Sequence, residues 1–86
     1  MNREFKTGDK VQHFKRQWIE DKSQPTYTYE IIGIAMHTET EEQLVVYKAL
    51  YGECKMYARP YDMFVEEVDK EKYPDSEQKY RFELCR

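Results

Sequence analysis

Residues 44–59 read LVVYKALYGECKMYAR, and this stretch decides the fold. Alternate residues of an extended strand share one face, so Val45, Tyr47 and Ala49 are expected on the same side of a strand. Gly52 supplies the positive φ that a tight turn requires. The pattern therefore predicts a β-hairpin, with strands at 44–50 and 54–59 joined by a turn at 51–53.

The flanking segments predict three more strands. The segment 27–37 is rich in Tyr and Ile, which suit a pleated and half-buried surface. Its alternation fails around Gly33, and a glycine inside a strand often marks a bulge or bend. Residues 9–15 and 80–84 alternate as shorter strands, the second of which would close the sheet.

Helical turns and irregular segments connect these strands. Thr38 and Glu41 match the capping box, which predicts one helical turn in which the Thr38 hydroxyl accepts the Glu41 amide hydrogen. The remaining expectations are a lead-in at 1–8, a loop at 16–26 with Trp18 folded over an apolar surface, a helical turn at 61–64, a short strand at 65–68 and a charged loop at 69–79.

These elements predict one domain over residues 1–86. The predicted fold is all-β, a small barrel of five to six short strands with one or two single helical turns. Closure into a barrel would remove the exposed strand edges. Thirteen of the 86 residues are aromatic, which is enough for a core in a chain this short.

Charge and cysteine content narrow the setting. The net charge is −3, with a surplus of two positive charges in residues 1–22 and of five negative charges in residues 62–78. A basic footprint over the whole protein for nucleic acid is therefore absent, and a local N-terminal patch remains open. Two cysteines, no apolar leader after Met1 and no long apolar run predict a cytoplasmic protein without a membrane span.

Seven segments, taken in order, resemble a small bacterial family known as domain of unknown function 1653. They are GDKVQHF (8–14), YEIIGIA (29–35), HTET (37–40), LVVYKALYG (44–52), RP (59–60), DMF (62–64) and RFE (81–83). The resemblance implies an SH3-like β-barrel and carries no established activity. The chain departs from the common pattern in a longer connection between Phe14 and Tyr29 and a longer acidic segment before Tyr80.

The candidate ligand-binding residues lie in the segment 37–59. They are His37, Glu39, Tyr47, Tyr51, Tyr57 and Arg59. If His37 and Arg59 converge, an anion can bind Arg59 while tyrosine rings flank it. The structural alternative is that Arg59 pairs with Glu39 or Glu30 and that His37 donates to a backbone carbonyl.

Metal and nucleophile sites are less favoured. His13, His37, Cys54 and Cys85 do not have the close spacing of zinc signatures, so neither metal nor cofactor is expected. Cys54 follows an acidic residue, which would raise the pKa of its thiol and not activate it.

Three functions remain open from the sequence. The preferred one is a binding module for a peptide or a small anionic ligand, with an unknown protein or small molecule as the partner. The second is a small enzyme with His37 as general base and Arg59 as anion holder. The third is an RNA-binding module, which the overall acidity disfavours.

Overall fold

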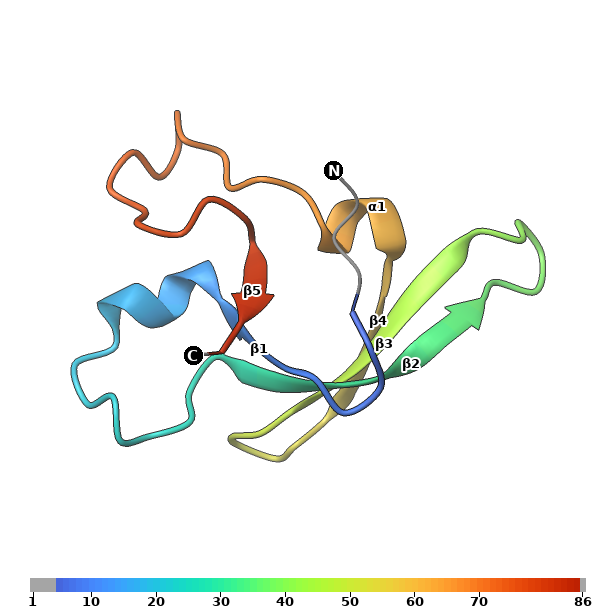
Figure 1. Ribbon diagram of the computed structural model, residues 1–86, viewed down its shortest axis with the longest axis horizontal. Helices are drawn as coiled ribbons and strands as arrows, with labels where there is room; N and C mark the ends of the chain where they lie inside the picture. The colour runs from blue at the N-terminus through green and yellow to red at the C-terminus, as the bar shows by residue number, and fades with distance from the viewer. Residues whose placement is uncertain (1–4, 86) are drawn as a thin grey trace.

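The computed structural model describes residues 5–85 and is mostly β, which confirms the predicted class. Five antiparallel strands form one sheet in the order β4-β3-β2-β1-β5 (Figure 1). The elements in chain order are β1 (Lys10–His13), a 3-10 helix η1 (Phe14–Trp18), β2 (Thr28–Met36), β3 (Gln43–Ala49), β4 (Met56–Pro60), a single helical turn α1 (Tyr61–Phe64) and β5 (Phe82–Leu84). The predicted lead-in at 1–8 lies partly outside the described residues.

The bulge predicted at Gly33 is present in β2. The register with β3 shifts between Ile31 and Gly33, so that Ile31 pairs with Tyr47 while Ile34 pairs with Val45. Ile31 and Ile34 are three residues apart, yet each lies opposite a buried residue on the same face of β3. The extra residue brings Ile34 to the same side of the sheet as Ile31, although Ile34 is 43% exposed near the end of the strand, and this explains why alternation fails in the sequence.

The hairpin of β3 and β4 follows the predicted pattern. Val45, Tyr47 and Ala49 are buried, and the residues between them are more exposed. Gly52 has φ of 60° in the turn, and Cys54 has φ of 55°. Arg59 lies opposite Val45, so its side chain starts from the same face as the core.

The sheet is open between β4 and β5, so the predicted closure into a barrel is not shown by the strand pairing of the described residues. Aromatic packing joins these two edges. Phe64 of α1, which follows β4 directly, stacks on Phe82 of β5 with ring centroids 4.2 Å apart and planes 8° apart. Tyr47 contacts both rings at 5.2 and 5.5 Å. Phe64 and Phe82 are 0% and 1% exposed, so this stack is the centre of the core.

The turn after β2 differs from the predicted capping box. The Glu41 amide donates to the His37 carbonyl at 2.9 Å and not to the Thr38 hydroxyl. The His37 ring accepts at Nδ1 from the amides of Glu39 and Thr40, at 3.1 and 3.3 Å. His37 therefore takes the capping role. Its ring nitrogen accepts hydrogen bonds from the first free amides of the turn, as a hydroxyl at this position would.

The predicted loop at 16–26 begins as η1 and is then organised around Arg16. The Arg16 guanidinium donates to the carbonyls of Lys22, Gln24 and Thr26 at 2.8–2.9 Å. Trp18 lies against Phe14 and Tyr73 at 6.3 Å from each ring, as expected for folding back, yet remains 47% exposed.

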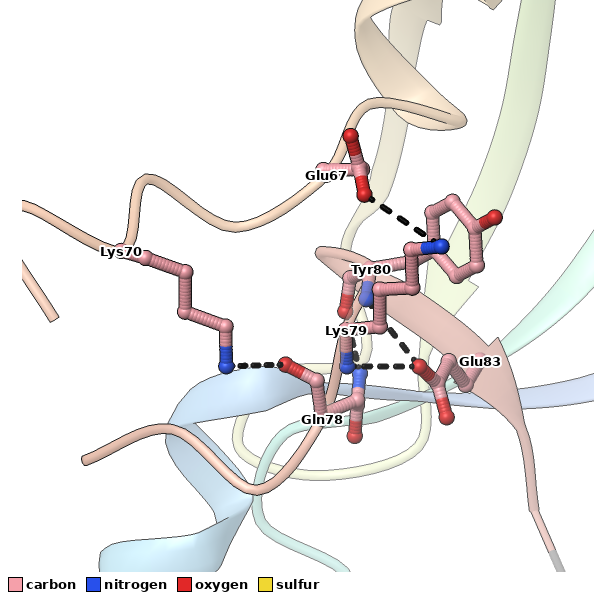
Figure 2. A network of polar contacts seen from close by, with 6 residues as sticks. All are labelled: Glu67, Lys70, Gln78, Lys79, Tyr80 and Glu83. Atoms are coloured by element: carbon pink, nitrogen blue, oxygen red, sulfur yellow. Dashed lines mark hydrogen bonds and ion pairs between the residues drawn. The ribbon is translucent and has the colours of Figure 1, made fainter. Parts of the chain in front are cut away.

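The charged loop at 69–79 is held by hydrogen bonds to β5 and to the loop itself. Figure 2 shows the Glu83 carboxylate accepting the amides of Lys79 and Tyr80, both at 3.0 Å. Lys79 pairs with Glu67 at 3.6 Å, and Lys70 donates to the Gln78 carbonyl at 3.5 Å.

The segment before this loop was expected to be a short strand at 65–68. It contributes only an isolated bridge between Glu67 and Tyr80, so the strand prediction was wrong.

The connection between β1 and β2 contacts the charged loop at 69–79 through Gln17. The Gln17 side chain donates to the Asp75 carbonyl at 2.7 Å and accepts the Glu77 amide at 2.6 Å. In the described part of the chain, no helix is both long and apolar enough to span a membrane.

Replacement of Phe64 by Ala is expected to destabilise the protein by about 3–5 kcal/mol, because it removes one half of the central stack. Met63→Ala is the matched control, since Met63 lies on the same helical turn and is 45% exposed. Its expected effect is below about 1 kcal/mol. Urea denaturation followed by circular dichroism measures both, and equal effects would contradict the assigned core.

Candidate functional site

The structure separates the six predicted site residues into two groups. His37 and Glu39 lie in the turn between β2 and β3, where the His37 ring caps backbone amides. Arg59 lies opposite Val45, which in turn pairs with Ile34. His37 lies three residues beyond Ile34 along the chain, which corresponds to about 10 Å in an extended strand. The sequence made one anion site conditional on the convergence of His37 and Arg59, and the structure gives no contact between these two side chains.

Tyr47, Tyr57 and Arg59 do come together on the face of the sheet that bears the core. The rings of Tyr47 and Tyr57 are 5.6 Å apart, and Tyr57 is 45% exposed. Burial raises the pKa of Tyr47, and a hydrogen bond and the charge of the Arg59 guanidinium oppose this shift. The same guanidinium lies 5.7 Å from the ring centroid of Phe82, so it packs directly on the core.

Arg59 does not make the ion pair that the structural alternative expected. Among residues 5–85, no carboxylate lies within ion-pair distance of its guanidinium, and neither Glu30 nor Glu39 contacts it. The contacts of its guanidinium are instead the Phe82 ring and the Tyr47 hydroxyl.

Tyr51 belongs to a neighbouring cluster of tyrosines. Its hydroxyl lies 2.8 Å from that of Tyr29, and its ring lies 5.9 Å from that of Tyr27. Burial raises the pKa of Tyr29 far above its usual range, and the hydrogen bond with Tyr51 adds to this shift. The Tyr29 hydroxyl therefore remains protonated, and the ring contacts among these tyrosines serve as packing.

A pocket of about 280 Å³ adjoins Arg59 and collects cationic side chains from distant segments. We call it the basic pocket; its lining residues are His13, Phe14, Lys15, Arg59, Asp69, Lys72, Tyr73 and Arg81. Arg81 pairs with Glu66 at 3.4 Å. Lys15, Arg59 and Lys72 have no carboxylate at ion-pair distance within residues 5–85, so the pocket carries excess positive charge.

The single acid of the basic pocket, Asp69, is engaged by its own turn. Its Oδ1 accepts the amides of Glu71 and Lys72 at 3.1 and 3.3 Å. Lys15 and Lys72 place their ammonium groups 5.8 and 5.9 Å from the centroid of the Tyr73 ring. The cations are thus held near one another by an aromatic side chain and not by acids.

His13 forms one wall of the basic pocket and is neutral at pH 7. Burial lowers its pKa to about 4, and the charges of Lys15, Arg59 and Arg81 add to this shift. The Nδ1 atom accepts the Lys15 amide hydrogen at 3.1 Å, so the proton of the neutral ring is on Nε2. His13 therefore keeps one N–H donor that is not used by this contact.

An apolar depression of about 390 Å³ adjoins the basic pocket. We call it the aromatic groove; its lining residues are Lys15, Trp18, Ile19, Tyr27 and Tyr73. Lys15 and Tyr73 line both cavities, so the two are neighbours that share these side chains. Tyr27 has φ of 64°, which is unusual for a bulky side chain, and its ring contacts His13 at 5.7 Å.

A larger pocket of about 570 Å³ is less suited to a ligand. It is lined in part by Arg16, Gln17, Lys22 and Gln78, whose polar atoms already hold backbone groups of the long connections. Within residues 5–85, no three His, Cys, Asp or Glu side chains are grouped to hold a metal ion.

The sequence interpretation missed most of the basic pocket. Lys15 and His13 sit at the end of a predicted strand, and the positive balance of residues 1–22 was a usable signal. Lys72 and Tyr73 lie in the acidic loop, and nothing local to that loop indicates that it folds back against η1.

Unfolding is expected to depend on pH through His13. Its folded pKa of about 4 lies below the unfolded value of 6.5, so its contribution is fully present above pH 6.5 and is lost as the pH falls through 4. For a partly exposed ring this amounts to about 2–3 kcal/mol. His13→Asn retains an acceptor for the Lys15 amide but has no titrating ring. Between pH 7 and pH 4, urea titrations should therefore show a smaller loss of unfolding free energy for this variant than for the wild type, by that amount. Parallel curves for both proteins would contradict the assignment.

Comparison with known proteins gives a family and no activity. A family model, DUF1653, described as a protein of unknown function, matches residues 9–84. No curated protein and no solved structure matches the chain. The matched range contains all five strands, the basic pocket and the aromatic groove. By this match over nearly its whole length, the chain belongs to the DUF1653 family.

Proposed function

We propose that the protein is a small binding module that accepts an anionic ligand in the basic pocket. The observation that carries this is the concentration of Lys15, Arg59 and Lys72 without carboxylate partners, in a chain whose net charge is −3. Three segments far apart in the sequence supply them. Folding brings like charges together at an electrostatic cost, and a bound anion would relieve that cost.

The chemistry of the pocket suits recognition of an oxyanion. Arg59 offers a planar fork of N–H donors, which binds carboxylate or phosphate with two hydrogen bonds. The two lysines add mobile point charges, and the neutral His13 ring adds an Nε2 donor. The Arg59 guanidinium packs against the Phe82 ring, so little side-chain entropy of Arg59 would be lost on binding.

A peptide with an acidic residue and a small anionic molecule would both fit this chemistry.

The free thiols of Cys54 and Cys85 support a reducing compartment, and on that ground we propose that the protein functions in the cytoplasm. A small SH3-like barrel remains our proposal for the fold family, supported by five short antiparallel strands around one aromatic core.

A thermal-shift series tests the anion pocket. Inorganic phosphate, citrate and a tetraglutamate peptide are titrated against the wild type, Arg59→Gln and Lys72→Ala. We expect at least one anion to raise the wild-type Tm, since ligand at about 100 times its Kd adds about 2.7 kcal/mol. Both variants should lose the shift, because each removes a cation from the pocket.

The controls are Lys55→Ala and His37→Ala. Lys55 pairs with Glu53 beside the β3–β4 turn, and His37 caps its own turn. Both should keep the wild-type response after correction for any change in starting Tm. An anion response that survives in Arg59→Gln and Lys72→Ala, or is lost in His37→Ala, would overturn the proposal.

A further inference from the structure

Two neighbouring cavities of opposite character would suit a ligand that has two parts. The basic pocket is lined mainly by cations, and the aromatic groove is lined by Trp18, Ile19, Tyr27 and Tyr73 with one lysine. Lys15 and Tyr73 belong to both, and the Lys15 ammonium group lies 5.8 Å from the centroid of the Tyr73 ring. One ligand can therefore place an anionic group in the first cavity and a planar apolar ring in the second.

From this juxtaposition we infer that the ligand is a free nucleoside monophosphate. The inference rests on the proposed anion-binding function. The phosphate would occupy the basic pocket, the sugar would pass Lys15, and the base would lie in the aromatic groove.

The charge balance favours phosphate over carboxylate. A phosphate monoester carries about −1.5 to −2 charges at pH 7, whereas a carboxylate carries one. Three cations without acid partners, together with an Arg59 fork, match the larger charge. The residual charge of the pocket would remain positive after a carboxylate bound.

The groove offers a stacking surface that does not read base identity. Trp18 is 47% exposed, and every base has an apolar face that stacks on an indole or phenol ring. The Trp18 and Tyr73 ring centroids are 6.3 Å apart, and the ring planes are tilted by 39°. A base inserted between two rings needs two stacking distances, roughly 7 Å in all, which is more than this separation. A base therefore lies over one ring and not between the two.

Fluorescence of the single tryptophan provides a direct readout, because Trp18 lines the groove itself. AMP is titrated into the protein with excitation at the red edge of the indole band, where adenine does not absorb. We expect AMP to quench Trp18 in a saturable manner. Adenosine and ribose 5-phosphate should each bind about tenfold more weakly than AMP, since each fills only one cavity.

Calorimetry of two variants separates the cavities. Trp18→Leu should weaken AMP about tenfold and leave ribose 5-phosphate unchanged, because it removes stacking alone. Lys72→Ala should weaken AMP and ribose 5-phosphate equally and leave adenosine unchanged. Lys55→Ala is the control, and circular dichroism establishes that each variant is folded.

The outcomes distinguish this inference from the function on which it rests. If neither the phosphates nor citrate nor tetraglutamate binds, the anion-binding function itself is wrong. If only the carboxylates bind, the anion pocket stands and the nucleotide inference fails. If ribose 5-phosphate binds as tightly as AMP, the anion pocket stands and the nucleotide inference fails. Tighter binding of N-acetyltyrosine than of AMP also overturns it, in favour of an aromatic carboxylate or peptide.

A further arm tests whether the nucleotide is free. Tetra-adenylate RNA is compared with AMP at two salt concentrations. A free nucleotide is indicated if the oligomer binds no more tightly than AMP. The inference of a free nucleotide fails, in favour of a single strand, if the oligomer binds more tightly and its affinity falls more steeply with salt, because more phosphates are then neutralised.

Discussion

The stack of Phe64 on Phe82 is the contact on which the rest of the structure depends. It joins the two edge regions of an open sheet, since Phe64 follows β4 and Phe82 belongs to β5. Among the described residues, β4 and β5 do not pair with each other, and backbone hydrogen bonds join only the segment after α1 to the segment before β5, through Val68 with Lys79 and Arg81 with Glu66. Side-chain packing therefore joins the two strands themselves. Tyr47 completes the contact from the middle of the sheet, at 5.2 Å and 5.5 Å from the two rings.

The same stack positions the proposed site. Phe82 contacts the Arg59 guanidinium at 5.7 Å and the His13 ring at 5.1 Å, so two walls of the basic pocket rest directly on the core. The opposite wall is the acidic loop, fastened by Glu83, Gln17 and its own turn. A rigid core therefore holds one side of the pocket, and a network of polar contacts holds the other.

Local patterns were sufficient for the strands and insufficient for the site. The period of two in β3 and the lone Gly33 in β2 report the sheet and its bulge, because both effects act within one strand. The placement of Lys72 beside His13 depends on contacts between segments about sixty residues apart. The capping box also misled, because His37, one residue earlier, accepts the amides of Glu39 and Thr40, and its carbonyl accepts the Glu41 amide that Thr38 was expected to hold.

The pairing of β1 with β5 has a consequence for biosynthesis. Val11 lies opposite Leu84 and His13 opposite Phe82, so β1, which is synthesised early, cannot pair with β5 until β5 itself has been synthesised. Phe64 precedes Phe82 in the chain, so it leaves the ribosome first and then has Tyr47 and Phe5 as its ring contacts until Phe82 follows. Until β5 emerges, the nascent chain carries an uncovered aromatic surface, and completion of the core follows translation of this last strand.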